Sequence, residues 1–326
     1  MCNAGLVVLE ARRFLRAVRG RRSQVAFSRR LGFRSNVCAK WESGSRMPTA
    51  ATALRACSRA GIDVPAALHA FSADTAILLD PINDENVAAW LRAQLGDQPI
   101  TRVAARARLS RFRISRFLNG QTRPRLPEFF ILLHALTERL ADFVALLVDV
   151  RQIPRLAAEH AKLAASRRAA FAHPWTSAVV ALLDTDAFRK RGAVDAEVLA
   201  EALGTESSVA QQCLDVLTEA GVLRRRPGRY VLRAPLVTDT RIAPEQALAL
   251  RRHWAAVSSE RLASAGAVDW FGYSVFSVSR ADYLKMRQLY ADFYQSLRGL
   301  IADSQPSETV GLLTLHLVQW SMPEGK

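Results

Sequence analysis

The chain has 326 residues, half of them apolar, so it is long enough to form several domains with buried cores. No apolar run reaches the roughly 18 residues of a membrane span, and the first residues lack the pattern of a secretory signal peptide. Lysine plus arginine number 45 against 30 aspartates and glutamates, a net charge of +15 that attracts polyanions, most commonly nucleic acid. We therefore expect a cytoplasmic, nucleoid-associated protein that has no contact with a membrane.

The positive charge is concentrated at the N-terminal end of the chain. Residues 1–72 carry 13 basic and 3 acidic side chains, a net charge of +10, whereas residues 234–326 carry 9 of each and are neutral. A local basic region of this kind is typical of a surface that binds nucleic acid. On charge alone, a solvated basic face without a partner stays open as an alternative.

An internal repeat with an offset of 76 residues organises the first half of the chain. SNVCAKWESGSRMP (residues 35–48) aligns with FRISRFLNGQTRP (residues 112–124), so that these pairs match: Trp41 with Phe117, Gly44 with Gly120, and Pro48 with Pro124. Each copy predicts two short helices joined by a tight turn, then a helix-ending glycine and a proline that opens the next helix. Two helices in this arrangement form a helix-turn-helix, whose second helix fits the major groove of DNA.

In the first copy, Gly32 provides the turn, because glycine takes a positive φ without strain. The second helix is expected to begin at Arg34 or Ser35 and to run through Trp41. Its outward face then carries side chains that bond base edges or phosphates, namely Arg34, Ser35, Asn36 and Lys40.

Residues 23–62 resemble the helix-turn-helix domains of the Cro and phage-repressor (XRE) class, most specifically in the W-E-x-G-x-x-x-P tail that begins at Trp41. The resemblance implies a five-helix domain that binds double-stranded DNA. It also implies phosphate contacts from Gln24 and Arg46 and base recognition by the second helix. The DNA contacts expected from this copy are Gln24, Arg34, Ser35, Asn36, Lys40 and Arg46.

The second copy keeps the apolar pattern and has eight arginines and no acid between Pro99 and Pro127. Arg108 stands where the first copy has Gly32, so either an arginine bears a positive φ, at about 1 kcal/mol, or the turn differs. Two interpretations stay open: a degenerate copy that grips phosphates, or one that packs on a partner. The candidate phosphate contacts are Arg111, Arg113, Arg116 and Arg123.

Residues 194–233 predict two helices followed by a β-hairpin around Pro227 and Gly228, the pattern of a winged helix. The hairpin can lay four arginines along a phosphate backbone: Arg224, Arg225, Arg226 and Arg229. The second helix of this module carries Glu206 and no basic residue near its start, which counts against base recognition. A pure protein-contact role for the module therefore stays open.

The tail predicts a helix over residues 244–265, a strand over 270–279, a long helix over 281–301 and a strand over 308–321. Residues 165–322, with an FxxxW motif before the winged helix, resemble a C-terminal domain of unknown function in a family of bacterial putative regulators. The resemblance implies regulation and names no ligand. We expect this α+β region to form a homodimer or to bind a protein or small-molecule effector.

The chain carries no pattern typical of an enzyme, a cofactor site or a metal site. The six histidines are scattered, and no glycine-rich phosphate loop or nucleophile with a base is present. The cysteines share no metal-type spacing and are expected to be free thiols in a reducing compartment: Cys2, Cys38, Cys57 and Cys213. We expect no enzymatic activity, no cofactor and no metal ion.

The sequence thus predicts a mainly α protein with tandem five-helix helix-turn-helix domains, then a winged helix and a small α+β domain. The expected boundaries are 1–76, 77–152, 153–233 (with a leading helix) and 234–326. The function that fits best is that of a bacterial transcriptional regulator of repressor type, which binds specific double-stranded DNA as a homodimer. Two alternatives remain: a protein-interaction module, such as an antirepressor or antitoxin-like partner, and an RNA-binding protein.

Overall fold

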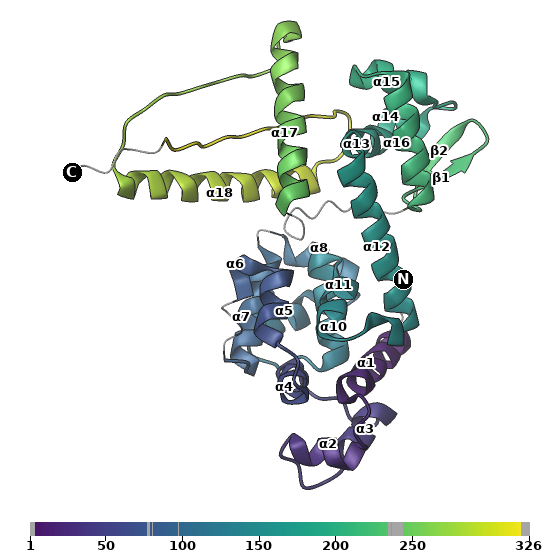
Figure 1. Cartoon of the computed structure of the whole chain (residues 1–326), viewed down its shortest axis with the longest axis vertical. Coiled ribbons are helices and arrows are strands. Elements are labelled where there is room, and N and C mark those ends of the chain that lie inside the picture. The colour runs from purple at the N-terminus through teal and green to yellow at the C-terminus, as the bar shows by residue number, and fades with distance from the viewer. Residues whose placement is uncertain are drawn as a thin grey trace. The chain divides into compact units, whose positions relative to one another are not determined.

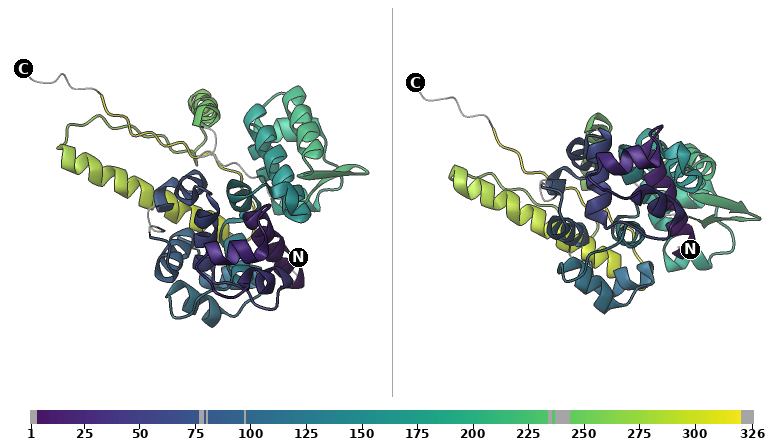
Figure 2. Two further views of the ribbon diagram at one scale, coloured as in Figure 1. Left: turned by 60° about the horizontal axis from the view of Figure 1, so that its bottom comes forward. Right: turned by 90° about the horizontal axis from the view of Figure 1, so that it is seen from below.

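The structure is a computed structural model, and it describes residues 4–76, 79, 81–96, 98–233, 236 and 244–320. This part of the chain is mainly helical with one two-stranded antiparallel sheet, which confirms the expected mainly α fold (Figure 1 and Figure 2). No helix in the described ranges combines the length and the apolar character needed to cross a bilayer. Cys2 and residues 77 and 234, where two of the expected domains begin, lie outside the described residues.

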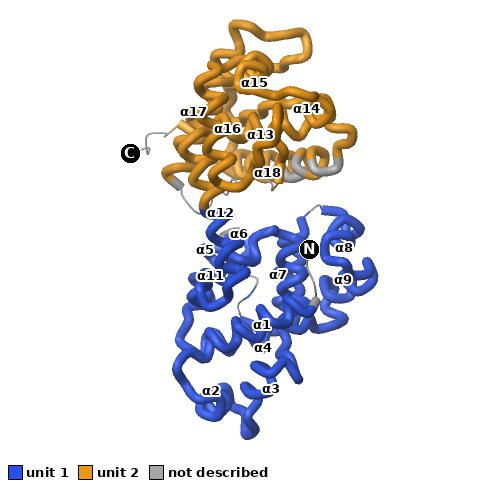
Figure 3. Tube along the Cα trace, turned by 90° about the vertical axis from the view of Figure 1, so that its right-hand side faces the viewer, with its two compact units in different colours: residues 1–164 blue, residues 165–326 orange. Residues whose placement is uncertain are grey.

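The chain divides into two compact units, Met1–Ala164 and Ala165–Lys326 (Figure 3). Several helices of the first unit begin after side chains that accept a hydrogen bond from the backbone three residues on, as Ser23, Thr49 and Asp63 do. Its elements are α1 (Ala4–Arg19), α2 (Gln24–Arg30), α3 (Val37–Ser43), α4 (Ala50–Ala60), α5 (Val64–Phe71), α6 (Ala73–Ala76), α7 (Asp84–Leu95), α8 (Ile100–Ala107), α9 (Arg111–Leu118), α10 (Leu126–Thr137), α11 (Leu140–Leu147), η2 (Val150–Gln152) and α12 (Pro154–Ala172), which continues past the unit boundary.

The helices of the first unit recur at the 76-residue offset found in the sequence. Helix α11 has the bounds of α5 shifted by 76 residues, and α8, α9 and α10 follow α2, α3 and α4 within two residues at either end. Helix α7 ends at residue 95, which is the end of α1 shifted by 76 residues, but it begins at residue 84, four residues after the shifted start of α1. The two halves of this unit therefore share one order of helices.

The two halves meet through contacts that obey the same offset. The backbone N–H of Ala50 donates to the Pro124 carbonyl at 2.9 Å, and that of Leu126 donates to the Pro48 carbonyl, also at 2.9 Å. Helix α1 packs on α10, and α7, the equivalent of α1, packs on α4. Each half thus gives the other the same donor, acceptor and helix contact, as two-fold related subunits do in a symmetric dimer.

A continuous apolar core also joins the two halves, and it encloses one ion pair. The ring of Phe71 lies 5.4 Å from that of Phe143 and 5.9 Å from that of Trp90, centroid to centroid. The guanidinium of Arg139 lies 4.4 Å from the centre of the Phe71 ring and donates to the Phe71 carbonyl at 3.1 Å. Its Nε is 3.4 Å from Asp142 Oδ2, and both side chains are buried.

The second unit contains the predicted hairpin, which projects beyond the helices α13–α16 in all views (Figure 1 and Figure 2). In its register Leu223 lies opposite Leu232, and Gly228 takes a φ of +71° at the turn. Below the hairpin, Leu199, Cys213 and Leu217 are fully buried. The elements are α13 (Thr176–Leu183), α14 (Asp186–Lys190), α15 (Ala196–Leu203), α16 (Ser207–Glu219), β1 (Leu223–Arg226), β2 (Arg229–Leu232), α17 (Pro244–Arg261), η3 (Leu262–Ser264) and α18 (Arg280–Asp303).

The two strands predicted for the tail are not formed in the described residues. Residues 270–279 lead into α18 and residues 308–320 lead out of it as extended segments, and no ladder of hydrogen bonds pairs either one (Figure 1). Their aromatic and β-branched residues favour extended backbone, but a strand also needs a hydrogen-bonded neighbour. The expectation of an α+β tail was therefore wrong for the part of the chain that the structure describes; its position 321 lies outside that part.

Three cysteines are free and buried: Cys38, Cys57 and Cys213. Burial raises the pKa of the Cys57 thiol to about 12 and that of Cys213 to about 11. The thiolate is the reactive form, so these two side chains are chemically inert at neutral pH.

Candidate nucleic-acid interface

A buried serine fixes the angle of the first helix pair, which comprises α2, α3 and the turn between them. The hydroxyl of Ser28 on α2 accepts a hydrogen bond from the Cys38 N–H of α3 at 3.1 Å and donates to the Gln24 carbonyl at 2.7 Å. Asn36 caps α3, since its Oδ1 accepts a hydrogen bond from the Ala39 N–H at 3.2 Å. The two helices are therefore held together by hydrogen bonds as well as by apolar contacts.

Helix α3 begins at Val37, later than the expected start at Arg34 or Ser35, because Asn36 is its cap. Arg34 and Ser35 are exposed in the turn, and Lys40 is exposed on the helix. A bidentate hydrogen bond from Asn36 to adenine would need the oxygen that the cap already uses. Asn36 therefore has a structural role, and base recognition by it stays a prediction.

Glu42, in the W-E-x-G tail, ties the end of α3 to α1 and α2. Arg19 Nε lies 2.5 Å from Glu42 Oε1, Gln24 Nε2 donates to Oε2 at 2.9 Å, and Arg12 Nε donates to the Glu42 carbonyl at 2.6 Å. Burial raises the pKa of Glu42, but the hydrogen bonds from Arg19 and Gln24 outweigh it and hold this pKa below its usual 4.5. Gln24, an expected phosphate contact, is thus half-buried and engaged with Glu42.

Around these contacts the first helix pair presents a basic surface to solvent. No acidic residue occurs between residues 24 and 41. The expected contacts Arg34, Lys40 and Arg46 are all exposed. Two further exposed arginines on α2 were missed by the sequence interpretation, although the helical period of that segment indicates them: Arg29 and Arg30.

The second helix pair, α8 and α9, keeps the turn of the first despite its arginine. Arg108 has φ 53° and ψ 39°, the left-handed conformation that Gly32 adopts with φ +85°. Ser110 then caps α9 by accepting a hydrogen bond from the Arg113 N–H at 3.3 Å. The tertiary contacts of this copy therefore hold an arginine where glycine is unstrained.

The two turns serve as matched controls for each other in a stability experiment. Gly32→Arg is expected to lower the free energy of unfolding by about 1 kcal/mol, because the position is open to solvent and only the backbone resists the side chain. Arg108→Gly is expected to leave the stability unchanged or raise it by up to about 1 kcal/mol. Glycine relieves the backbone strain of the folded state, which stabilises the protein, but it also raises the entropy of the unfolded chain, which destabilises it. Urea unfolding of both variants checks this, and a clear loss of stability in Arg108→Gly would contradict it.

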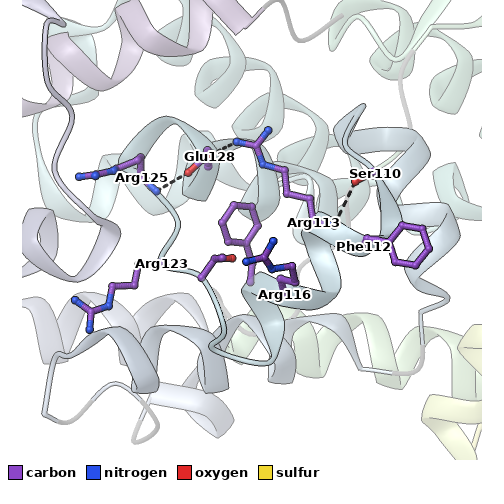
Figure 4. Close-up of a pocket in the computed structure, with 9 residues that line it drawn as sticks. Ser110, Phe112, Arg113, Arg116, Arg123, Arg125 and Glu128 are labelled. Atoms are coloured by element: carbon purple, nitrogen blue, oxygen red, sulfur yellow. Dashed lines mark hydrogen bonds and ion pairs between the residues drawn. The ribbon is translucent and has the colours of Figure 1, made fainter.

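Helix α9 and the loop after it line a shallow cavity of about 500 Å³. Arg113 and Arg116 reach it from α9, and Arg123 and Arg125 reach it from the loop (Figure 4). Glu128 forms an ion pair with Arg113 and accepts a hydrogen bond from the Arg125 N–H at 2.7 Å. The charge of Arg113 is thus already compensated within the protein.

The other arginines of this cavity are less constrained. Arg123 is 72% exposed, with Nε 3.5 Å from Asp84 Oδ2, and Arg125 donates to the Met47 carbonyl at 3.0 Å. Arg116 is exposed, and no acidic side chain among the described residues forms an ion pair with it. Arg116 is therefore the cation of this cavity that is best placed to meet an outside anion.

Phe112 is a surface residue that the sequence interpretation missed. Its side chain is 68% exposed, points away from the other labelled side chains, and lies under the guanidinium of Arg111 at 4.9 Å (Figure 4). It occupies the position that Asn36 holds in the first copy, and this mismatch was the available signal. Arg125 and Glu128 were also missed, because their contacts depend on the folded loop.

The hairpin of the second unit carries a separate basic surface. Arg226 and Arg229 lie directly opposite each other in the strand register, a like-charge pair that costs stability unless an anion lies between them. The α16 side of this module is different, because from Glu206 to Glu219 it has no basic residue. All four expected wing contacts are exposed: Arg224, Arg225, Arg226 and Arg229.

The family described as a domain of unknown function, DUF4423, matches residues 155–318, half of the chain. The chain belongs to the DUF4423 family. The matched region covers the hairpin module and the tail, which agrees with the resemblance to a C-terminal domain of unknown function. It does not include either helix pair of the first unit, and no curated protein or solved structure matches the chain.

Proposed function

We propose that this DUF4423 family member is a transcriptional regulator that binds specific double-stranded DNA through tandem helix-turn-helix domains of the XRE type. The observation that carries the proposal is the exposed basic face of the first helix pair, which has no acid between residues 24 and 41. Ser28 and Glu42 hold α3 at a set angle beneath that face. A rigid, cationic second helix is what the major groove requires.

Recognition of bases is assigned to the residues at the start and on the outer side of α3. Ser35 and Arg34 precede its first turn and Lys40 lies on its outer face. In helix-turn-helix complexes the N-terminal residues of the second helix contact base edges, and lysine or arginine bonds guanine. Arg29, Arg30 and the loop residue Arg46 then contact phosphates on either side.

The second helix pair is assigned to the phosphate backbone rather than to base edges. Phe112 replaces the polar residue at the start of the helix, and Glu128 compensates Arg113. Arg111 and Arg116 remain to meet phosphates. Because the two halves meet through reciprocal contacts at residues 48–50 and 124–126, one chain presents a selective and a non-selective helix pair together.

The experiment that tests this function is a gel shift with genomic fragments that include the gene's own promoter. Ser35→Ala combined with Lys40→Ala is expected to lower selectivity by at least about 10-fold, since a good bidentate base contact discriminates by about 1–3 kcal/mol. Asn36 is left intact, because its replacement would also remove the cap of α3, worth about 0.5–2 kcal/mol.

The matched control is Arg55→Ala combined with Ser58→Ala, which likewise removes one cation and one hydroxyl from exposed positions, here on α4. That variant is expected to select the wild-type fragments. If Ser35→Ala with Lys40→Ala also selects them unchanged, α3 does not recognise bases. If the wild-type protein prefers no duplex, a protein-interaction or RNA-binding role takes its place.

A further inference from the structure

The C-terminal part of the second unit carries apolar side chains that its own chain leaves uncovered. Every residue from 261 to 282 is exposed, and none of the described residues of α18 is buried. Trp270 is 85% exposed, Tyr273 95% and Val275 73%. Large aromatic side chains at such exposure mark a surface that is buried against a partner.

Helix α18 adds an apolar stripe to this surface. Leu289, Phe293 and Leu300 are 67%, 51% and 69% exposed, and Leu297 is half-exposed between them. These positions recur at the helical period, so they lie along one side of the helix. A soluble helix keeps such a stripe only where another apolar layer covers it.

The extended segments 270–279 and 308–320 leave their backbone groups without a sheet. Among the described residues no backbone hydrogen bond pairs them with a neighbour. The start of segment 308–320 is nevertheless anchored. The Asp186 N–H donates to the Ser307 carbonyl at 2.8 Å, and Val310 packs against the apolar core beneath the hairpin. Apolar, unpaired extended segments are templates for strand addition.

The accessible area leaves room for a large interface. The chain of 36.0 kDa exposes 19848 Å². Two separate folded units, each of half that mass, are expected to expose about 16,000 Å² in total. The difference, about 4,000 Å² per chain, exceeds the roughly 1,000–2,500 Å² that each partner of an obligate dimer buries, so the exposed area is sufficient for such an interface.

Charge separates this region from the rest of the protein. Residues 265–320 hold 4 basic and 5 acidic side chains, a net charge of −1, in a chain whose total is +15. A polyanion finds no attraction here, and two copies of the region can approach without repulsion.

We infer that residues 265–320 form an intertwined homodimer with the same residues of a second copy of the chain. Segments 270–279 and 308–320 of the two copies pair into one sheet, and the α18 stripes cover it. This interface would hold together the homodimer expected of the proposed regulator. It involves no DNA, so its test is independent of the DNA-binding proposal.

Sedimentation or light scattering of the whole 326-residue chain at about 10 µM tests the interface by mass action. The wild type is expected at twice 36.0 kDa, about 72 kDa. Trp270→Ser combined with Tyr273→Ser should shift the mass to 36.0 kDa without loss of fold, because neither side chain is covered within one chain. Leu289→Asp with Leu300→Asp, on α18, should give the same shift.

Hydrogen exchange supplies a second readout, with Leu146→Ser as a control at an exposed apolar site of the first unit. Amides of 270–279 and 308–320 should exchange at least about tenfold more slowly in the wild type than in either tail variant. The Leu146 variant should keep the dimer mass and the protection. A wild type of 36.0 kDa, or tail variants that remain dimers, would overturn the inference.

Discussion

Arg139→Ala is expected to lower the free energy of unfolding of the first unit by about 3–5 kcal/mol, the cost of breaking a buried ion pair. Arg139 and Asp142 expose only 7% and 5% of their side chains. Removal of the guanidinium would leave the Asp142 carboxylate buried without it, next to His160, whose Nε2 lies 3.8 Å from Asp142 Oδ1. It would also remove the hydrogen bond to the Phe71 carbonyl that links the two halves.

Urea denaturation followed by circular dichroism measures this loss, and the chain supplies its own control. Arg151 is 87% exposed and pairs with Asp149 at 2.8 Å, so it forms the same kind of ion pair in water. Arg151→Ala is expected to change the unfolding midpoint by no measurable amount. Equal effects of the two substitutions would show that the Arg139 pair does not stabilise the contact between the halves.

The double variant Arg111→Ala, Arg116→Ala is expected to weaken binding to every duplex alike. Each phosphate contact contributes about 0.9 to the slope of log affinity against log salt, so loss of two should lower the slope by about 1.8. These arginines are exposed on α9, whereas Arg113 is compensated by Glu128 and is left in place. Uniform weakening is expected because phosphates carry no base sequence.

Fluorescence anisotropy between about 50 and 200 mM salt measures the slope on selected and unrelated duplexes. Arg151→Ala with Arg189→Ala removes the same charge from exposed positions outside the helix pairs, and it should leave the slope near that of the wild type. A loss confined to one duplex would show that α9 recognises bases. An unchanged slope would remove the second copy from the interface.

Because of the reciprocal contacts between the halves, one chain of the proposed regulator presents two helix pairs to DNA. Two-fold repressor dimers bring two identical helix pairs to DNA, but here the two pairs belong to one chain and differ in chemistry. The differences lie in Gly32 and Arg108 at the turn and in Asn36 and Phe112 at the second helix. We expect each chain to prefer an asymmetric half-site, and linkage of the two pairs raises the affinity of the weaker one.

Much of the fold could be predicted because it depends on local chemistry. The 76-residue repeat, the glycine turns and the hairpin at Pro227 and Gly228 follow from residues close together in the chain. For the second turn the sequence left two outcomes open, a positive φ at Arg108 or a different turn. Arg108 takes the positive φ because the second copy makes the same bend as the first copy makes at Gly32. Local caps and backbone preferences act over three or four residues, within reach of sequence patterns.

The tertiary structure alone decided what the candidate DNA contacts do. Gln24 and Asn36 look outward by helical period, but Glu42 and the Ala39 N–H engage them. Glu128, fifteen residues beyond Arg113, compensates its charge, so a sequence count of arginines overstates the cations available to DNA. Such assignments depend on atoms brought within hydrogen-bond distance by packing, which no residue pattern contains.

In the tail, too, local sequence and tertiary packing decide different parts of the secondary structure. Its composition determined that residues 270–279 and 308–320 are extended, because β-branched and aromatic side chains disfavour other backbone states there. Whether an extended segment becomes a strand depends on a neighbour to accept and donate its hydrogen bonds, and the described part of one chain supplies none. The sequence by itself therefore determined the conformation of these segments and the repeat ahead of them, while tertiary packing decided which side chains and backbone groups remain for a partner.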